Sequence, residues 1–281
     1  MTTQAFSGSC PPDLIQRLSI LPFDRLQGKR VVIKVGGSLL ANERDALHDA
    51  VWLWATGPQP VLVHGGGLAI SAWLHKLNVP TRFENGMRVT DAQTLEVVRM
   101  VLLGQVNPAL VLQLTQLGAK AIGLCGTDKN MVHARRASER LGLVGEVESI
   151  DPTLIESLLA KGYLPIVAPL ACGPGGSYLN VNANQVAAHL AGSLQAELHV
   201  ILSDVAGVCR QDGSVIPTLT LPLAQQLLAQ NIIHGGMIPK MNACLAAAGN
   251  VSHVHILDGR EPHVILRLLA GECLGTRILP R

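Results

Sequence analysis

Residues 31–38 read VVIKVGGS, a short β-branched run that is followed at once by two glycines. A run of Val and Ile of this length predicts a strand, and glycines at its carboxyl end predict a tight loop. Further short apolar runs follow along the chain, separated by longer stretches with helical periodicity. Such alternation is typical of βαβ units, so the sequence predicts an α/β fold, an αβα sandwich around a mainly parallel central sheet.

The expected elements of this fold can be placed along the chain. Strands are predicted at residues 31–35, 61–64, 120–124, 164–169, 198–203 and 253–257. Amphipathic stretches predict helices at residues 91–103, 152–161 and 237–248.

The chain is long enough for two modest lobes. The Gly- and Pro-rich loop at 171–178 and the end of the helix after it are both candidate divisions. We place the division at the second, which predicts lobes over 29–192 and 193–281 behind an N-terminal extension over 1–28. In this extension PPDLIQRLSIL predicts a short helix, because proline is tolerated in a first helical turn.

Composition excludes several functional classes. The chain has 281 residues, a formal net charge of +2 and 3% aromatic residues. Because it has neither a basic run nor stacking aromatics, nucleic acid is not an expected partner. No stretch approaches the roughly 18 uninterrupted apolar residues of a membrane span, and no signal peptide is expected. The cysteines are scattered without a C-x-x-C pair, so we expect free thiols, a cytoplasmic location and no membrane association.

Two glycine-rich loops after strands are candidates for anion binding. The first strand carries Lys34 inside an apolar run and leads into Gly36 and Gly37. A buried lysine needs a paired or bound anion, and glycines let backbone N–H groups approach a ligand. The second strand ends in HGGG at 64–67 before a helix, where N–H groups and the positive helix end favour an anion. Neither loop matches a dinucleotide fingerprint or a Walker A loop, and ordinary turns are the alternative.

Two basic residues lie beside predicted helix starts. In NGMRVTD, Arg88 precedes a helix that Thr90 or Asp91 would cap, and an arginine there can hold a carboxylate at two points. In GGMIPK, Lys240 lies near a helix N-terminus, where a cation is misplaced unless a phosphate is bound. The alternative interpretations are a surface arginine in a loop and a solvated lysine.

Three asparagines in LNVNANQ, residues 179–185, alternate with small apolar residues. If the stretch is a strand, all three amides lie on one face, and an Ala- and Leu-rich helical stretch follows. Such strand-to-helix junctions are where α/β proteins bind ligands. In LSDVAGV, Ser203 and Asp204 end another strand and line either a nucleotide pocket or a plain turn. His253 and His255 share a strand face without a third ligand, so no protein-held metal is expected.

The ordered motifs IKVGGS, HGGG, NGMRVTD, NVNAN, LSDVAGV and GGMIPK resemble those of the acetylglutamate kinases of the amino-acid-kinase family. The resemblance implies that the lobe over 29–192 binds N-acetyl-L-glutamate and the lobe over 193–281 binds ATP, with Mg²⁺ held by the nucleotide phosphates. It implies phosphorylation of the substrate's γ-carboxylate to N-acetyl-L-glutamyl 5-phosphate in arginine biosynthesis, and a homodimer or a higher oligomer.

The resemblance also implies roles for single residues. Lys34 and Lys240 would neutralise the transferred phosphoryl group, while Arg88 would hold the α-carboxylate and Asn180 would fix the bound substrate. Gly66 and Gly67 would donate backbone hydrogen bonds to the substrate. The residues implied on the phosphate and nucleotide side are Gly36, Gly37, Ser203, Asp204, Gly235 and Gly236. No general base is needed, because a carboxylate is already nucleophilic and phosphoryl transfer depends on positioning and charge neutralisation.

The chain departs from the family's pattern in two places. Asn184 stands where the family has an aspartate that holds both lysines, so its ability to turn over substrate becomes a question. Leu268 and Ala270 stand where arginine-inhibited members have Glu and Phe, although His263 is kept, so arginine feedback is not expected.

Two alternative functions stay open. One is a kinase for a related acyl-amino acid such as carrier-bound aminoadipate, and the other is a low-activity or non-catalytic member that binds an amino acid or a nucleotide. Both lysines and the glycine loops favour an active kinase, whereas Asn184 favours the last alternative.

Overall fold

The computed structural model describes residues 13–14, 17, 26–36, 44–84, 86–210, 212–233 and 235–279. Gly37, a predicted phosphate-binding residue, lies outside the described residues. Most of the predicted helix in the N-terminal extension lies outside them too, and the three described positions there, 13, 14 and 17, are helical.

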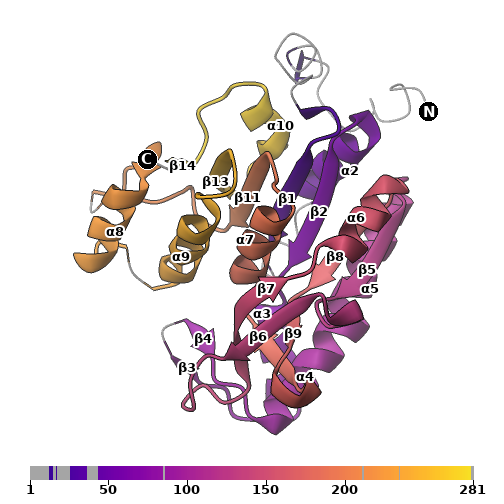
Figure 1. Cartoon of the computed structure of the whole chain (residues 1–281). Coiled ribbons are helices and arrows are strands. Elements are labelled where there is room, and N and C mark those ends of the chain that lie inside the picture. Colours follow the sequence, from indigo (N-terminus) through magenta and orange to yellow (C-terminus); the bar gives the residue numbers. More distant parts are fainter. Residues whose placement is uncertain are drawn as a thin grey trace.

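An eight-stranded sheet forms the centre of the molecule (Figure 1). In sheet order its strands are β12 (Thr218–Thr220), β14 (Thr276–Leu279), β13 (His253–Asp258), β11 (Leu198–Ser203), β1 (Arg30–Val35), β2 (Gln59–His64), β8 (Leu164–Ala168) and β5 (Ala121–Cys125). All neighbours are parallel except β13 and β14. The six predicted strands all belong to this sheet, so the prediction of a mainly parallel α/β fold is confirmed.

Helices cover both faces of the sheet, as an αβα sandwich requires. One face carries α2 (Arg44–Thr56), α3 (Gly67–Lys76), α4 (Ala92–Val101), α5 (Asn107–Gln116) and α10 (Val264–Leu269). The other carries α6 (Thr153–Ala160), α7 (Ala183–Ser193), α8 (Leu221–Ala229) and α9 (Met237–Ala247), and α7 and α9 lie side by side (Figure 1).

The alternation of side chains along β1 explains the two layers. Val31, Ile33 and Val35 lie in the core cluster of the first face, whereas Val32 lies in the cluster of the second. Lys34 has the same parity as Val32 and therefore points toward the side that α7 covers. This geometry places a charged side chain between the end of the sheet and the start of α7.

Short strands outside the main sheet were not predicted. A small closed unit consists of β6 (Val132–Arg136), β7 (Val144–Ile150), β9 (Leu170–Cys172) and β10 (Tyr178–Val181), and β3 (Phe83–Glu84) and β4 (Met87–Arg88) form a hairpin. Most of these strands are short, and the longer β7 contains two glutamates, Glu146 and Glu148, so they lack the apolar run that reveals a central strand. They nevertheless matter for the site, because β4 carries Arg88 and β10 carries Asn180.

A continuous helical stretch from Ala92 to Gln116 joins α4, a π-helical turn at Leu102–Val106 and α5. By length and apolarity alone this stretch of 25 residues is compatible with a membrane span, since an 18-residue window within it has a mean hydropathy of 1.5. Leu95, Val98 and Leu114 of this stretch pack into the core cluster shared with the sheet. The stretch therefore has the packing of a core helix.

Candidate functional site

The carboxyl ends of three adjacent parallel strands bring the predicted motifs to one edge of the sheet. Val35 at the end of β1 is in register with His64 at the end of β2, and β11 on the other side of β1 ends at Ser203. Ligands of open α/β sheets bind at this edge, because the loops after parallel strands all emerge there. The motifs that are far apart in the sequence therefore meet because the strands are parallel.

A cavity of about 250 Å³ lies at this edge. The predicted site residues that line it are Lys34, Gly66, Gly67, Arg88, Asn180 and Asn184. The nucleotide-side residues Gly36, Ser203, Asp204, Gly235, Gly236 and Lys240 are not in its wall. The structure thus gathers the predicted acceptor-side residues around one cavity and leaves the others beside it.

Arg88 is held by its neighbours on one side of its guanidinium group. Its Nη2 donates to the carbonyl oxygen of Gly67 at 3.0 Å and to Ser71 Oγ at 2.8 Å, and the ring of Phe83 lies 4.7 Å from its guanidinium carbon. Nη1 is buried and has no hydrogen-bond partner in the described part of the chain. Burial lowers the pKa of Arg88, so its charge is poorly compensated here. A ligand carboxylate would supply the missing partner.

The three asparagines do not share a strand face, so that prediction is wrong. β10 ends at Val181, Asn182 caps α7 by accepting a hydrogen bond from the Asn184 N–H at 2.9 Å, and Asn184 lies in the first helical turn. The chain changes from period two to the helical period after Val181, which ends the alternation. All three amides still line the cavity, and Asn180 Nδ2 donates to Thr90 Oγ1 at 3.0 Å. The predicted strand-to-helix junction is confirmed, and the helix begins at Ala183, inside the asparagine-rich stretch.

Lys34 is buried in the cavity wall, with 7% of its surface exposed. Burial, and then the charge of Lys240, lower the pKa of Lys34 to about 8, although Asp204 opposes this shift. Within the described ranges, the Lys34 ammonium has neither a hydrogen-bond nor an ion-pair partner. Asn184 lies in the same cavity wall and is neutral, and its amide oxygen is buried and unpartnered in the part of the chain that the structure describes. The ammonium group of Lys34 therefore favours an anion here, whereas the Asn184 oxygen needs a hydrogen-bond donor.

On the nucleotide side Asp204, Gly235 and Gly236 are exposed, whereas Ser203 is buried. Lys240 lies in the first turn of α9 and its Nζ is 3.4 Å from Asp204 Oδ1, to which Ser203 Oγ also donates at 3.3 Å. Gly235 has a φ of +57°, which favours glycine, and with Gly236 it precedes α9 without a side-chain cap. Exposed backbone N–H groups at a helix N-terminus and a nearby lysine are suited to phosphate.

Only the structure shows which residue caps α4 and that His64 and Asn107 form a buried pair beside the HGGG loop. Asp91 is the N-cap of α4, one of the two predicted caps. His64 Nδ1 lies 2.8 Å from the carbonyl oxygen of Gly65, and its Nε2 lies 3.1 Å from Asn107 Nδ2, which donates to the carbonyl oxygen of Ile166. Burial lowers the pKa of His64 to about 4, so the ring is neutral, with the proton on Nδ1 and an acceptor at Nε2.

Asn107 was not predicted as a site residue, because its only signal in the sequence is a polar residue before a proline inside an apolar helical stretch. Leu102 was not predicted either. A Cβ at Gly66 would lie 2.4 Å from Leu102 Cδ2, so the glycine loop and the π-helical turn pack directly against each other. Together Asn107 and Leu102 support the loop that forms one wall of the cavity.

No group of three or more His, Cys, Asp or Glu side chains with the arrangement of a metal site occurs within residues 26–36, 44–84, 86–210, 212–233 and 235–279 or at positions 13, 14 and 17. His255 is buried and the ring of His253 lies 2.9 Å, Nδ1 to Nη2, from Arg277. The described donors at the site are amides, lysines and backbone N–H groups, which suit anions rather than cations.

The histidine of the C-terminal pattern, His263, has a structural partner. His263 precedes α10 with a φ of +49°, and its Nδ1 lies 2.8 Å from Oδ1 of the buried Asp49 on α2, whose other oxygen accepts from the Ile265 N–H. Burial raises the pKa of Asp49, although the bond to His263 opposes the shift. Asp49 therefore fixes the start of α10 on α2.

Comparison with known proteins identifies the family. A model of the amino acid kinase family matches residues 29–258. The chain therefore belongs to the amino acid kinase family. The resemblance that six short motifs indicated is confirmed. Membership of this family, together with the acetylglutamate kinases described next, shows that the protein is a kinase.

Two curated relatives and one solved structure are similar over almost the whole chain. The acetylglutamate kinase of Synechococcus sp. (strain JA-2-3B'a(2-13)) is 41% identical in a match that covers 99% of this chain and 93% of that protein. The acetylglutamate kinase of Moorella thermoacetica is 41% identical and covers 94% of this chain and 96% of its own. The structure of smu.665 from Streptococcus mutans UA159 has a TM-score of 0.80 at 30% identity and covers 89% of this chain and 98% of its own.

Proposed function

We propose that this kinase transfers the γ-phosphoryl group of ATP to the γ-carboxylate of N-acetyl-L-glutamate, giving N-acetyl-L-glutamyl 5-phosphate in arginine biosynthesis. The similarity to acetylglutamate kinases over nearly the full chain supports this proposal. The observation that carries it is the cavity with two cationic side chains in its wall, Arg88 with an unpartnered buried nitrogen and Lys34 without a direct hydrogen-bond or ion-pair partner among the described residues. A dicarboxylate acceptor has one carboxylate for each.

The acceptor would be held at several points. Arg88 binds the α-carboxylate through Nη1, while Asn180 and the backbone N–H groups of Gly66 and Gly67 hold the acetylated amine and the reacting end. The bonds from Arg88 to Gly67 and Ser71 already set its orientation, which supports a role in positioning. The γ-carboxylate then lies toward Lys34 and needs no general base, because it is ionised at neutral pH.

The phosphoryl group would be transferred in a field of positive charge. Lys34 and Lys240 offset the negative charge of the transferred group, and N–H groups of Gly36, Gly235 and Gly236 donate to phosphate oxygens. We assign Gly37 to the same set and place Ser203 and Asp204 on the nucleotide side. Mg²⁺, bound to the nucleotide phosphates, would supply further charge neutralisation, because the described side chains at the site are not a typical magnesium ligand set.

The wider assignments follow from the same proposal. The lobe for the acceptor spans 29–192 and the lobe for ATP spans 193–281, with β1 and β11 joined across the division in one sheet. The exposed apolar side chains Leu68 and Leu77, at the two ends of α3, support a homo-oligomer, a dimer or a larger assembly. A cytoplasmic location fits a biosynthetic kinase whose cysteines are free.

An ADP-release assay with three acceptors tests this function. N-Acetyl-L-glutamate is expected to support turnover, whereas glutamate, which lacks the acetyl group, and aminoadipate, which is one methylene longer, are expected to support far less. Faster turnover with aminoadipate would assign the protein to a related acyl-amino acid, and ATP or acetylglutamate binding without turnover by any acceptor would assign it to the non-catalytic class. Lys161→Ala, on the exposed end of α6, is the matched control for variants of the two site lysines.

A further inference from the structure

The two site lysines repel each other, and Asn184, which lines the same cavity as Lys34, is neutral. The charge of Lys240 lowers the pKa of Lys34, which shows that the two ammonium groups interact. Asn184, in the wall of the same cavity as Lys34, offers only an amide oxygen, and that oxygen has no partner in the described part of the chain. Two like charges near a buried position need a counter-charge to stay in place before a nucleotide binds.

The charged and titratable groups that face Lys34 come from several elements. Lys240 faces it from α9 and Asp204 from the end of β11, while Arg88 on β4 lies in the wall of the same cavity. His199 on β11 also interacts with Lys34, but burial lowers its pKa to about 4, so its ring is neutral at physiological pH. Among these groups Asp204 is the one carboxylate.

Asp204 is placed to act on both lysines. Its Oδ1 lies 3.4 Å from Lys240 Nζ and accepts a hydrogen bond from Ser203 Oγ, which orients the carboxylate. β11, which ends one residue before Asp204, is the direct neighbour of β1, which carries Lys34. Burial raises the pKa of Asp204, but a backbone hydrogen bond and Lys240 outweigh that effect and leave its pKa below its usual value, so it is ionised at neutral pH.

We propose that Asp204 is the positioning residue of the lysine pair: it orients Lys240 and keeps Lys34 charged, and so supplies from β11 the counter-charge that Asn184 does not supply from α7. This inference rests on the proposed function and refines it, since Asp204 would otherwise serve only as a residue beside the nucleotide. The Asp204 side chain is 58% exposed, so the pair contributes little to folding stability and its effect is on placement and protonation.

The sign of the pH effect follows from the charges. Lys34 is active as the ammonium ion, and a nearby carboxylate raises its pKa whereas a nearby cation lowers it. Removing the charge of Asp204 therefore lowers the pKa of Lys34, and the decline of kcat/KM at high pH begins at a lower pH. The kcat/KM for ATP is the suitable quantity, because its pH profile reports groups of the free enzyme.

Four variants separate this role from others: Asp204→Asn, Asn184→Asp, the double variant, and Asp212→Asn. Asp204→Asn is expected to lower kcat on the order of tenfold and to move the alkaline decline to lower pH. The double variant, which moves the charge from β11 to α7, is expected to restore most of kcat and to return the decline toward higher pH. Asp212→Asn removes an exposed carboxylate that accepts from Ser214, and neither quantity is expected to change.

Two outcomes would overturn the proposal. One is an Asp204→Asn variant with a raised KM for ATP but an unchanged kcat and alkaline decline, which would make Asp204 a nucleotide contact only. The other is a double variant that is no better than Asp204→Asn.

A measurement without turnover keeps this test separate from the proposed function. Protein labelled with ¹³C at lysine Cε, with the Lys34 signal assigned from Lys34→Arg, gives the titration midpoint of Lys34 directly. The midpoint is expected near 8 in the parent, lower in Asp204→Asn and higher again in the double variant. Absence of turnover with every acceptor would refute the proposed function, whereas a midpoint that does not respond to Asp204 would refute this inference.

Discussion

The acceptor side and the nucleotide side of the site are built differently. On the acceptor side, Arg88 is buried and bonded to Gly67 and Ser71, and Asn180 is bonded to Thr90. On the nucleotide side, Asp204 is largely exposed, and its 3.4 Å contact with Lys240 is long for a charge-assisted hydrogen bond.

This difference suggests how the two substrates are recognised. A side chain that is held in place before binding loses little freedom when its ligand arrives, which favours a choice of acceptor by geometry. The exposed glycines and the loosely held Lys240 are instead expected to become ordered only when the nucleotide phosphates bind. We therefore expect changes on the acceptor side to act mainly on acceptor KM and changes to the lysine pair to act mainly on kcat.

The largest effect is expected from Lys34→Ala and Lys240→Ala. Each removes a positive charge from the place where negative charge develops, and loss of one oriented group of this kind costs on the order of a hundred- to a thousandfold in kcat. Steady-state kinetics with circular dichroism to verify folding is the measurement, and Lys161→Ala is the control. Near-parental kcat in either variant would show that the lysine has no role in phosphoryl transfer.

Arg88→Lys tests whether the acceptor side works by a two-point contact. Lysine keeps the charge but cannot reproduce the planar guanidinium, its bonds to Gly67 and Ser71, and a free Nη1. The KM for acetylglutamate is expected to rise roughly tenfold, with little change in the KM for ATP. Arg140→Lys, an exposed arginine, is the control. An unchanged acceptor KM would remove Arg88 from the acceptor site.

Asn184→Asp tests whether the lysine pair is under-stabilised. An aspartate here would give Lys34 the partner that it lacks among the described residues, and we expect kcat to rise by about tenfold, which corresponds to roughly 1.4 kcal/mol of barrier. The KM for ATP is expected to rise, because an added carboxylate repels phosphate. The helix should be unaffected, since Asn182 and not Asn184 caps α7. A kcat equal to or below that of the parent would mean that Asp204 already suffices.

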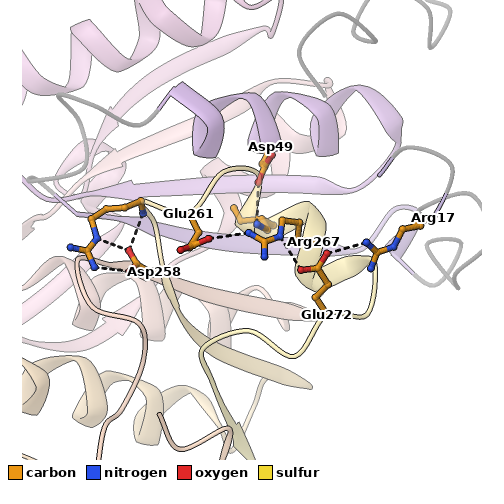
Figure 2. Close-up of polar contacts among 8 residues, drawn as sticks. Arg17, Asp49, Asp258, Glu261, Arg267 and Glu272 are labelled. Atoms are coloured by element: carbon orange, nitrogen blue, oxygen red, sulfur yellow. Dashed lines mark hydrogen bonds and ion pairs between the residues drawn. The ribbon is translucent and has the colours of Figure 1, made fainter. Parts of the chain in front are cut away.

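The smallest effect is expected from L-arginine as an inhibitor. Leu268 lines a second cavity of about 490 Å³ near the C-terminus, where the pattern of arginine-inhibited members has a carboxylate, and Glu272 in the same wall is already paired with Arg17 and Arg267 (Figure 2). A guanidinium group would find an apolar wall at Leu268. Millimolar arginine is expected to leave the initial rate nearly unchanged, and strong inhibition at sub-millimolar arginine would contradict this expectation.

Much of the fold was predictable because the relevant signals are local. The six central strands are short apolar runs, and their burial on both faces is what makes those runs visible in the sequence. The glycine loops after β1 and β2 follow from the same pattern, since parallel strands send all such loops to one edge. The small strands that carry Arg88 and Asn180 lack this signal, because they are short and only partly apolar.

By itself the sequence determined the layered α/β architecture, the edge of the sheet where the site lies, and the residue types that meet there. Only the tertiary structure decided which partners those residues have: that Asn182 caps α7, that Asn107 holds His64, and that Asp204 lies beside Lys240. The physical reason is the distance along the sequence over which each interaction acts. Periodicity and turn chemistry depend on neighbours within a few residues, whereas Asp204 and Lys240 meet only because β11 and α9 pack in one particular arrangement, which no local pattern specifies.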